Sequence, residues 1–146
     1  MNQNLFLEDI STGMEIPTIK KDPTTQQLVK YAGASGDFYQ IHYDMDYAKN
    51  NGLPGVILHG ALKNAFLAQL LTDWIGFDGR LKKLSVQYRG MDVPDVTLTC
   101  RGRVIHKYQV ENEFLVDCEI WIDNSQGQTT TLGTATIVIP SNGIEA

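Results

Sequence analysis

The sequence predicts an α+β protein in which a curved antiparallel sheet wraps around one long central helix. Residues 59–75 carry apolar side chains on nearly every side of a helical pattern, which is typical of a buried central helix. After Gly79 the period of the apolar residues changes from helical to two. One face of each later segment is apolar and the other mostly polar, as in an antiparallel sheet that covers a core on one side. The central helix is the element that this sheet would cover.

The segments before the central helix are predicted to form an edge strand and two helices. Residues 13–19 are extended and contain a proline, which suits an edge strand. A capping residue and a proline at 22–24 begin a helix over about 24–34, which Gly33 and Gly36 end. A loop over 37–44 leads to a short helix that Asn51-Gly52 stops. The apolar side of the first helix is expected to consist of Leu28, Val29 and Ala32.

Four long strands are predicted after the central helix, because apolar and polar residues alternate there and turn residues separate the runs. The strands cover 84–88, 96–104, 114–122 and 129–139, joined by turns at 92–95, 106–113 and 123–127. No internal repeat or linker divides the chain. Residues 1–146 are therefore expected to be one domain, long enough to bury a core.

Composition limits the classes of function. The net charge of -5 leaves no clustered basic face, so no nucleic-acid partner is expected. No apolar run approaches membrane-spanning length, and the start lacks the pattern of a signal peptide, so we expect a cytoplasmic protein without membrane association. Cys100 and Cys118 lie in predicted strands and are expected to be reduced core thiols. No CxxC or HExxH spacing is present, and no metal is predicted.

Two chemically distinctive loops flank the central helix. In the first, residues 31–44 (YAGASGDFYQIHYD), Asp37 and His42 stand five residues apart, just after two glycines. The second, residues 53–60 (LPGVILHG), brings His59 and Gly60 to the start of the central helix. Two such loops beside one buried helix are the layout of an active site.

These two stretches also carry a family resemblance. Residues 35–44, with Ser35-Gly36-Asp37 and Ile41-His42-Tyr43-Asp44, resemble the hydratase motif of MaoC-like proteins, S-G-D-x-N-P-[LIV]-H-x-D. Residues 56–62 (VILHGAL) are similar to the I-[AV]-H-G-M-L segment of that family. The resemblance covers about residues 5–140 and implies the hotdog fold, a curved antiparallel sheet around a long central helix.

The resemblance implies a lyase of fatty acid metabolism: an (R)-specific enoyl-CoA hydratase or a 3-hydroxyacyl-thioester dehydratase. Its substrate would be a thioester of CoA or acyl carrier protein, and no cofactor is expected. Carried over by motif, Asp37 and His42 handle one water molecule, and Gly60 offers its backbone N–H to the thioester carbonyl.

The chemistry gives a physical reason for these residue types. A carboxylate and an imidazole that hold one water can orient it, take one proton and deliver one on the same face of the substrate. Negative charge that builds on the thioester oxygen needs preorganised donors. The first N–H groups of a helix have no partner inside the helix, and glycine at that point allows the close approach of a ligand.

One pair of residues departs from the family motif. Tyr39 and Gln40 stand where the family has Asn-Pro, in the loop between the two catalytic candidates. We therefore assign Tyr39, Gln40 and His59 as candidate substrate-binding residues, although His59 also suits a structural hydrogen bond near the helix start. Asp44 is expected to cap the short helix that follows. The cations Arg80, Lys82, Lys83 and Arg89 suit either a solvated strand end or a phosphate site.

Two alternatives remain open at this stage. The first is a hotdog acyl-CoA thioesterase, which also places a carboxylate near the central helix. The second is a thioester-binding partner subunit of a heteromeric MaoC-like dehydratase, which the altered Tyr39-Gln40 pair keeps possible. We also expect edge-to-edge pairing of two chains, as a homodimer or as a heterodimer with a homologous chain.

Overall fold

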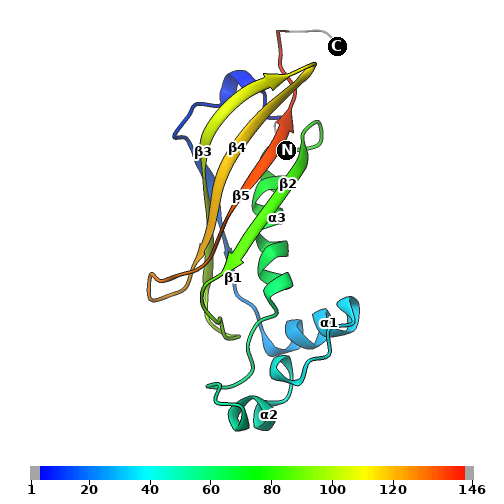
Figure 1. The fold of residues 1–146 in the computed structure, drawn as a ribbon, viewed down its shortest axis with the longest axis vertical. Helices are drawn as coiled ribbons and strands as arrows, with labels where there is room; N and C mark the ends of the chain where they lie inside the picture. The colour runs from blue at the N-terminus through cyan, green and yellow to red at the C-terminus, as the bar shows by residue number, and fades with distance from the viewer. Residues whose placement is uncertain (1–3, 144–146) are drawn as a thin grey trace.

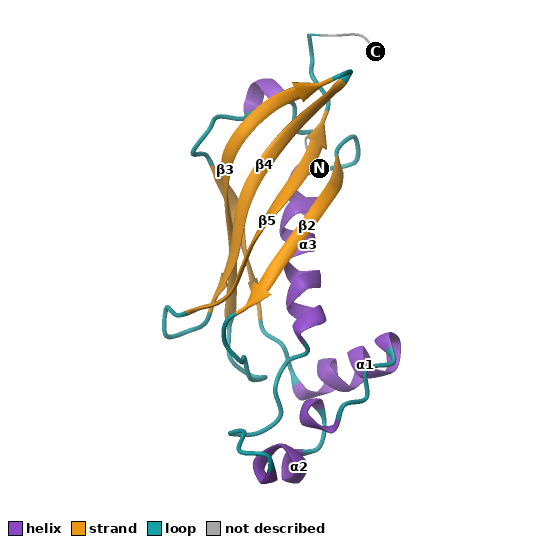
Figure 2. Cartoon of the chain, in the orientation of Figure 1, coloured by secondary structure: helices purple, strands orange, loops and turns teal. Residues whose placement is uncertain are grey.

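The computed structural model describes residues 4–143 and has the predicted α+β architecture (Figure 1). Five antiparallel strands form one curved sheet in the order β1-β3-β4-β5-β2, and the sheet wraps around helix α3 (Figure 2). The strands are β1 (Glu15–Lys21), β2 (Arg80–Tyr88), β3 (Leu98–Val110), β4 (Glu113–Asp123) and β5 (Thr129–Ile139), and the longest helix is α3 (Gly60–Ile75). The expected edge strand is confirmed, because β1 is an edge of the sheet and Pro17 lies in a break in its pairing with β3.

Helix α3 contacts all five strands and carries much of the core. Its buried side chains include Leu62, Phe66, Leu67, Leu70, Leu71 and Ile75. The helix is central, as predicted, but the sheet wraps only part of it. A stripe along the helix, Ala61, Ala65, Gln69, Thr72 and Asp73, is exposed. We call these five residues the open stripe.

Helices α1 (Thr25–Ser35) and α2 (Met45–Asn50) lie beyond the end of the sheet, near the start of α3 (Figure 1). The Thr24 hydroxyl accepts a hydrogen bond from the N–H of Gln27, and Gly36 ends α1 with a φ of 76°. Leu28 and Ala32 are buried as predicted, whereas Val29 is 57% exposed. Val29 was wrongly assigned to the apolar side, because only the face with Leu28 and Ala32, four residues apart, meets the core.

The turn predicted at 106–113 is mostly strand. Strand β3 continues to Val110, and only residues 111–112 form the turn to β4, with Glu111 at a φ of 53°. The pairing of β3 with β4 is interrupted between Val104 and His106. A bulge there shifts the alternation of inward and outward side chains, and this shift hides the second half of the strand from a search for period two.

Two of the expectations from composition concern membrane-spanning helices and the state of the two cysteines. Within the described residues, no helix is long and apolar enough to cross a membrane. Cys100 and Cys118 are free and buried, as predicted, and burial raises the pKa of each thiol to about 12.

Candidate active site

Asp37 stands immediately after the glycine that ends α1, and its loop fixes one of its two carboxylate oxygens. The N–H of Tyr39 donates to Oδ1 of Asp37 over 3.3 Å, and the N–H of Asp37 donates to the Ser35 hydroxyl over 3.2 Å. The second oxygen, Oδ2, faces His42. The side chain is 49% exposed, so the carboxylate is held by its loop and still open to solvent and ligands.

His42 ends the short 3-10 turn η2 (Gln40–His42) and is buried, with 7% exposure. Its Nδ1 lies 2.8 Å from the carbonyl oxygen of Ile57. Because a carbonyl can only accept, Nδ1 carries the proton in this hydrogen bond, and Nε2 of the neutral ring keeps its lone pair. Nε2 lies 3.9 Å from Oδ2 of Asp37. A water to one side of this line, about 2.8 Å from each atom, would bridge the two.

His59 contacts both Asp37 and His42. It precedes α3 and is 1% exposed. Its Nε2–H donates to the carbonyl oxygen of Asp37 over 3.2 Å, and its ring stacks on that of His42 with 3.8 Å between centroids. Tyr31 packs edge-on against the other side, at 4.8 Å. The ring of His59 therefore lies inside the protein, against His42, and not on the surface that a substrate would meet.

The burial of His59 predicts a pH dependence of stability. Burial, and then the neighbouring His42, lower the pKa of His59 below its usual 6.5, while the carbonyl and charge of Asp37 oppose the shift. The unfolded chain thus binds more protons below pH 6.5, and stability that is present above this pH is lost as the pH falls. Each unit of pKa depression corresponds to about 1.4 kcal/mol.

Urea unfolding from about pH 7.5 to about pH 5.5 measures this effect. We expect the free energy of unfolding to fall over this range in the wild type, and to fall less in His59→Gln, whose amide nitrogen reaches the position of the Nε2 donor to the Asp37 carbonyl and cannot titrate. An equal fall in both proteins would contradict a lowered pKa for His59.

Gly60 is the first residue of α3, and no acceptor within residues 4–143 takes its N–H or that of Ala61. A side chain at position 60 would meet the ring of Tyr88, because a Cβ there would lie 2.8 Å from a ring carbon. The Tyr88 phenol has a raised pKa, mainly because of burial and then because of Tyr31. Glycine thus lets an aromatic ring cover the helix start while two donors stay free.

The two residues that depart from the family motif lie at the rim of the site. The Tyr39 ring stands edge-on to His42 at 6.2 Å and to Tyr47 at 6.1 Å, and its phenol raises the pKa of Tyr47. The side chain of Gln40 is exposed, and its backbone carbonyl accepts the N–H of Asp44 over 2.8 Å. Asp44 caps α2 as predicted, since its carboxylate accepts the N–H of Tyr47 over 2.9 Å.

The three side chains of Asp37, His42 and His59 each offer one possible metal ligand atom within 4.8 Å of the others. Two features of the rings count against a shared metal. One nitrogen of each histidine already donates to a carbonyl. The rings are also stacked, with 22° between their planes, so their remaining lone pairs lie in two nearly parallel planes. Ligands of one metal ion must converge on it.

Sequence reasoning missed a buried ion pair next to the site. Lys63, on the first turn of α3, contacts Asp92 in the loop between β2 and β3, with 2.9 Å between Nζ and Oδ2. Both side chains are almost fully buried. The available signal was a lysine at a position where the apolar pattern of α3 requires a core residue.

The basic residues considered for a phosphate site are divided in the structure. Arg80 and Lys82 both pair with Glu113, at the end of β2 opposite to Tyr88 and Arg89. They form ordinary surface ion pairs and do not join Arg89 in one cluster.

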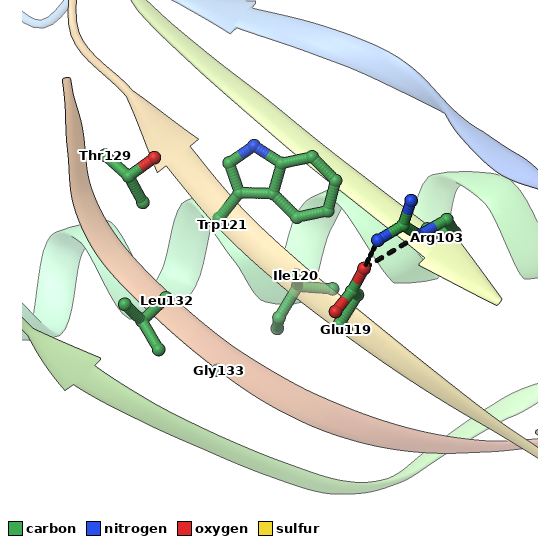
Figure 3. A pocket seen from close by; sticks show the side chains of 7 residues that line it. All are labelled: Arg103, Glu119, Ile120, Trp121, Thr129, Leu132 and Gly133. Carbon is green, nitrogen blue, oxygen red and sulfur yellow. Dashed lines mark hydrogen bonds and ion pairs between the residues drawn. The ribbon is translucent and has the colours of Figure 1, made fainter. Parts of the chain in front are cut away.

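A separate groove of about 310 Å³ lies on the face of the sheet opposite to α3 (Figure 3). The ion pair of Arg103 with Glu119 crosses it beside Trp121. None of the residues predicted for the site lines this groove, and we assign it no role.

Comparison with known proteins identifies the class to which this fold and site belong. The family model described as "MaoC like domain" matches residues 9–120. The chain therefore belongs to the MaoC-like domain family, and the resemblance drawn from the two motifs is confirmed.

Two relatives differ in how much of each chain they share. A protein from Rhodospirillum rubrum named (R)-specific enoyl-CoA hydratase is 26% identical over 143 residues, which cover 94% of both chains. Fatty acid synthase beta subunit TOXC from Cochliobolus carbonum is 36% identical over 70 residues, which cover 47% of this chain. That match covers only 3% of TOXC, so this chain corresponds to a small part of the synthase subunit.

Similar solved structures confirm the hotdog fold. R-hydratase PhaJ1 from Pseudomonas aeruginosa has a TM-score of 0.85 at 21% identity, covering 95% of this chain and 88% of PhaJ1. A chain of the ChsH1-ChsH2 complex from Mycobacterium tuberculosis has a TM-score of 0.77, also at 21% identity, covering 88% of this chain and 98% of that one.

Proposed function

We propose that this protein is a hydro-lyase that reversibly hydrates 2-enoyl thioesters to (R)-3-hydroxyacyl thioesters. One observation carries the proposal: Nε2 of His42, the ring nitrogen that does not bind the Ile57 carbonyl, lies 3.9 Å from a carboxylate oxygen of Asp37, next to the start of α3. Gly60 and Ala61 at that helix start have N–H groups that no acceptor among residues 4–143 takes. The membership of the MaoC-like family and the name of the Rhodospirillum rubrum relative also support this reaction.

The proposed reaction uses one water held between Asp37 and His42. As the water oxygen bonds to the β-carbon, one water proton passes to this pair, and the electrons of the double bond move toward the thioester oxygen. The Gly60 N–H, together with the partial positive charge of the helix N-terminus, stabilises the negative oxygen. The pair then returns one proton to the α-carbon on the same face. Atoms and charge balance without a cofactor.

The substrate is proposed to be a thioester of CoA or acyl carrier protein. The open stripe of α3 begins beside Gly60 with Ala61 and Ala65, two small residues that leave room for an acyl chain. Tyr39 and Gln40, at the rim, are proposed to contact the substrate. His59 lies against His42 and Asp37, so we now propose that it orients these two groups.

Paired chains are part of the proposal. Apolar side chains around the site are exposed, and the edge of β2 has no partner strand within the described chain. The exposed side chains are Phe38, Tyr39, Tyr43, Met45, Tyr88 and Met91. A homodimer, or a heterodimer with a homologous chain, would cover this surface. We also propose that residues 1–146 act as one domain in the cytoplasm, where free thiols such as Cys100 and Cys118 persist; residues 1–3 and 144–146 lie outside the described range.

Assays of the purified wild-type chain separate the candidate functions. A hydratase removes the absorbance of the conjugated enoyl thioester and forms a 3-hydroxyacyl thioester, whereas a thioesterase releases free thiol. A non-catalytic partner subunit does neither alone and gains activity only with a homologous chain. We expect hydration without thiol release. Thiol release without hydration, or no turnover of crotonyl-CoA and longer enoyl-CoA substrates, would contradict the proposal.

A change at the rim is predicted to alter substrate choice more than turnover. Tyr39→Asn with Gln40→Pro restores the family motif and removes an exposed aromatic ring beside His42. We expect the ratio of kcat/KM between long and short enoyl-CoA substrates to change by about tenfold, because one pocket contact is worth about 1–3 kcal/mol. Steady-state values of kcat/KM for a chain-length series measure this change. An equal ratio in the wild type and the double variant would show that Tyr39 and Gln40 do not contact the substrate.

A further inference from the structure

A charged cluster lies buried one helical turn behind the free N–H of Gly60. Lys63 and Asp92 pair at 2.9 Å, with 3% and 2% of their side chains exposed. The Thr130 hydroxyl of β5 donates to the same Asp92 oxygen over 2.6 Å. Lys63 also donates to the carbonyl of Gly90 over 2.9 Å. We call Lys63, Asp92 and Thr130 the buried triad, which joins α3, the loop between β2 and β3, and β5.

Fold stability alone does not account for such a cluster. Two charges removed from water lose their hydration, and apolar residues of similar volume are often as stable or more stable in the same place. Unlike apolar packing, the directional hydrogen bonds of the triad fix the positions of the groups around them. Those groups belong to the candidate active site.

The first connection runs from Asp92 to His42. The carbonyl oxygen of Asp92 accepts the N–H of Leu58 over 2.8 Å. The preceding residue, Ile57, accepts the Nδ1–H of His42 at its carbonyl over 2.8 Å and donates its N–H to Ile41 over 3.0 Å. The Ile57 carbonyl, which selects the tautomer of His42, belongs to the same peptide group as the Leu58 N–H. The loop that carries Asp92 therefore fixes the position of this peptide group.

The second connection runs from Lys63 to Gly60. The ammonium group of Lys63 lies 5.5 Å from the centre of the Tyr88 ring, which favours a cation over its face. The same ring packs so closely over Gly60 that no Cβ fits between them. Lys63 thus holds the ring that covers the helix start.

We propose that Lys63, Asp92 and Thr130 are positioning residues that hold the Ile57 carbonyl and the Tyr88 ring, and through them His42 and the Gly60 N–H, in their reactive arrangement. The catalytic consequence rests on the proposed function. The effect on the tautomer of His42 does not, and it can be observed in a protein that turns over no substrate.

The double variant Lys63→Met/Asp92→Leu tests the proposal, since it removes both charges together and leaves neither one unpaired in the core. Far-UV circular dichroism and thermal melting check that it folds. We expect kcat of enoyl-CoA hydration to fall about 10- to 100-fold with little change in KM, because the reacting groups are displaced and not removed. In nitrogen-15 correlation spectra of the histidines, we expect the Nδ1–H form of His42 to give way to a mixture of tautomers.

Two further variants calibrate the result. Thr130→Val keeps the shape of the side chain and removes one hydrogen bond to Asp92, so it is expected to fold and to lower kcat several-fold. The control Arg103→Gln/Glu119→Gln removes an ion pair on the outer face of the sheet and is expected to keep the wild-type kcat and the wild-type spectrum of His42.

The outcomes distinguish the two proposals. A folded double variant with the wild-type tautomer of His42 and the wild-type kcat would overturn the positioning role of the triad. If the double variant does not fold, an unchanged tautomer and an unchanged kcat in Thr130→Val would overturn it. A changed tautomer in a chain whose wild type hydrates no enoyl thioester would support the triad and contradict the proposed function alone.

Discussion

His42→Ala is expected to lower kcat of enoyl-CoA hydration by about 10²- to 10⁴-fold, the usual contribution of a positioned acid or base. The variant removes the one nitrogen whose lone pair faces the proposed water, because the other nitrogen is committed to the Ile57 carbonyl. Steady-state rates on crotonyl-CoA measure the loss. His106→Ala is the matched control: this histidine stacks on Tyr108 in β3, far from the site, and its removal is expected to leave kcat unchanged.

Asp37→Asn tests the second member of the Asp37–His42 pair. The amide oxygen can still accept the N–H of Tyr39, so the loop is kept while the negative charge beside His42 is lost. We expect a loss comparable with that of His42→Ala, and the double variant to lose little more than either single one, since groups that act as a unit are not additive. Full activity in either single variant would show that the substituted residue takes no part in the reaction.

Gly60→Ala is expected to reduce kcat/KM by about 10²- to 10³-fold, the usual cost of losing one donor to an oxyanion. The added Cβ would lie 2.8 Å from a ring carbon of Tyr88, so the ring or the helix start must move. Alanine keeps its N–H, and the loss would therefore come from displacement of the donor. Kinetics on one enoyl-CoA substrate, with circular dichroism to verify folding, measure the effect.

A second substitution separates this steric effect from others. Tyr88→Ala in the Gly60→Ala background removes the clash, and we expect part of the lost kcat/KM to return. Gly33→Ala is the matched control, because a Cβ at position 33 in α1 meets no atom within 4 Å. A Gly60→Ala variant with wild-type kcat/KM would contradict the use of this helix start as the oxyanion donor.

The parts of the fold that could be predicted are those whose pattern is local. The apolar run of 59–75 defined α3 to within one residue, and the proline of β1 indicated an edge strand. The extension of β3 to Val110 could not be predicted in this way, because a bulge after Val104 changes which side chains face inward. The exposure of Ala61 and Ala65 was also hidden, since it depends on how far the sheet curves around the helix.

In the candidate site, too, only the features with a local sequence pattern could be predicted. The motif placed Asp37, His42 and Gly60 within two loops, and these loops meet in the structure at the start of α3. The tautomer of His42 depends on the Ile57 carbonyl, fifteen residues away, and the buried pair joins Lys63 to Asp92, 29 residues away. Such long-range partners leave no periodic signal in the sequence. The stacking of His59 on His42 likewise appears only once the loops are folded.

The most direct test of one water held between Asp37 and His42 is hydration of an enoyl-CoA in heavy water by the purified chain. We expect loss of the enoyl absorbance and formation of a 3-hydroxyacyl-CoA in which deuterium at the α-carbon and oxygen at the β-carbon lie on the same face. The coupling constants of the product in proton NMR reveal this geometry. Addition on opposite faces, or no hydration by the wild-type chain, would contradict a water held between Asp37 and His42.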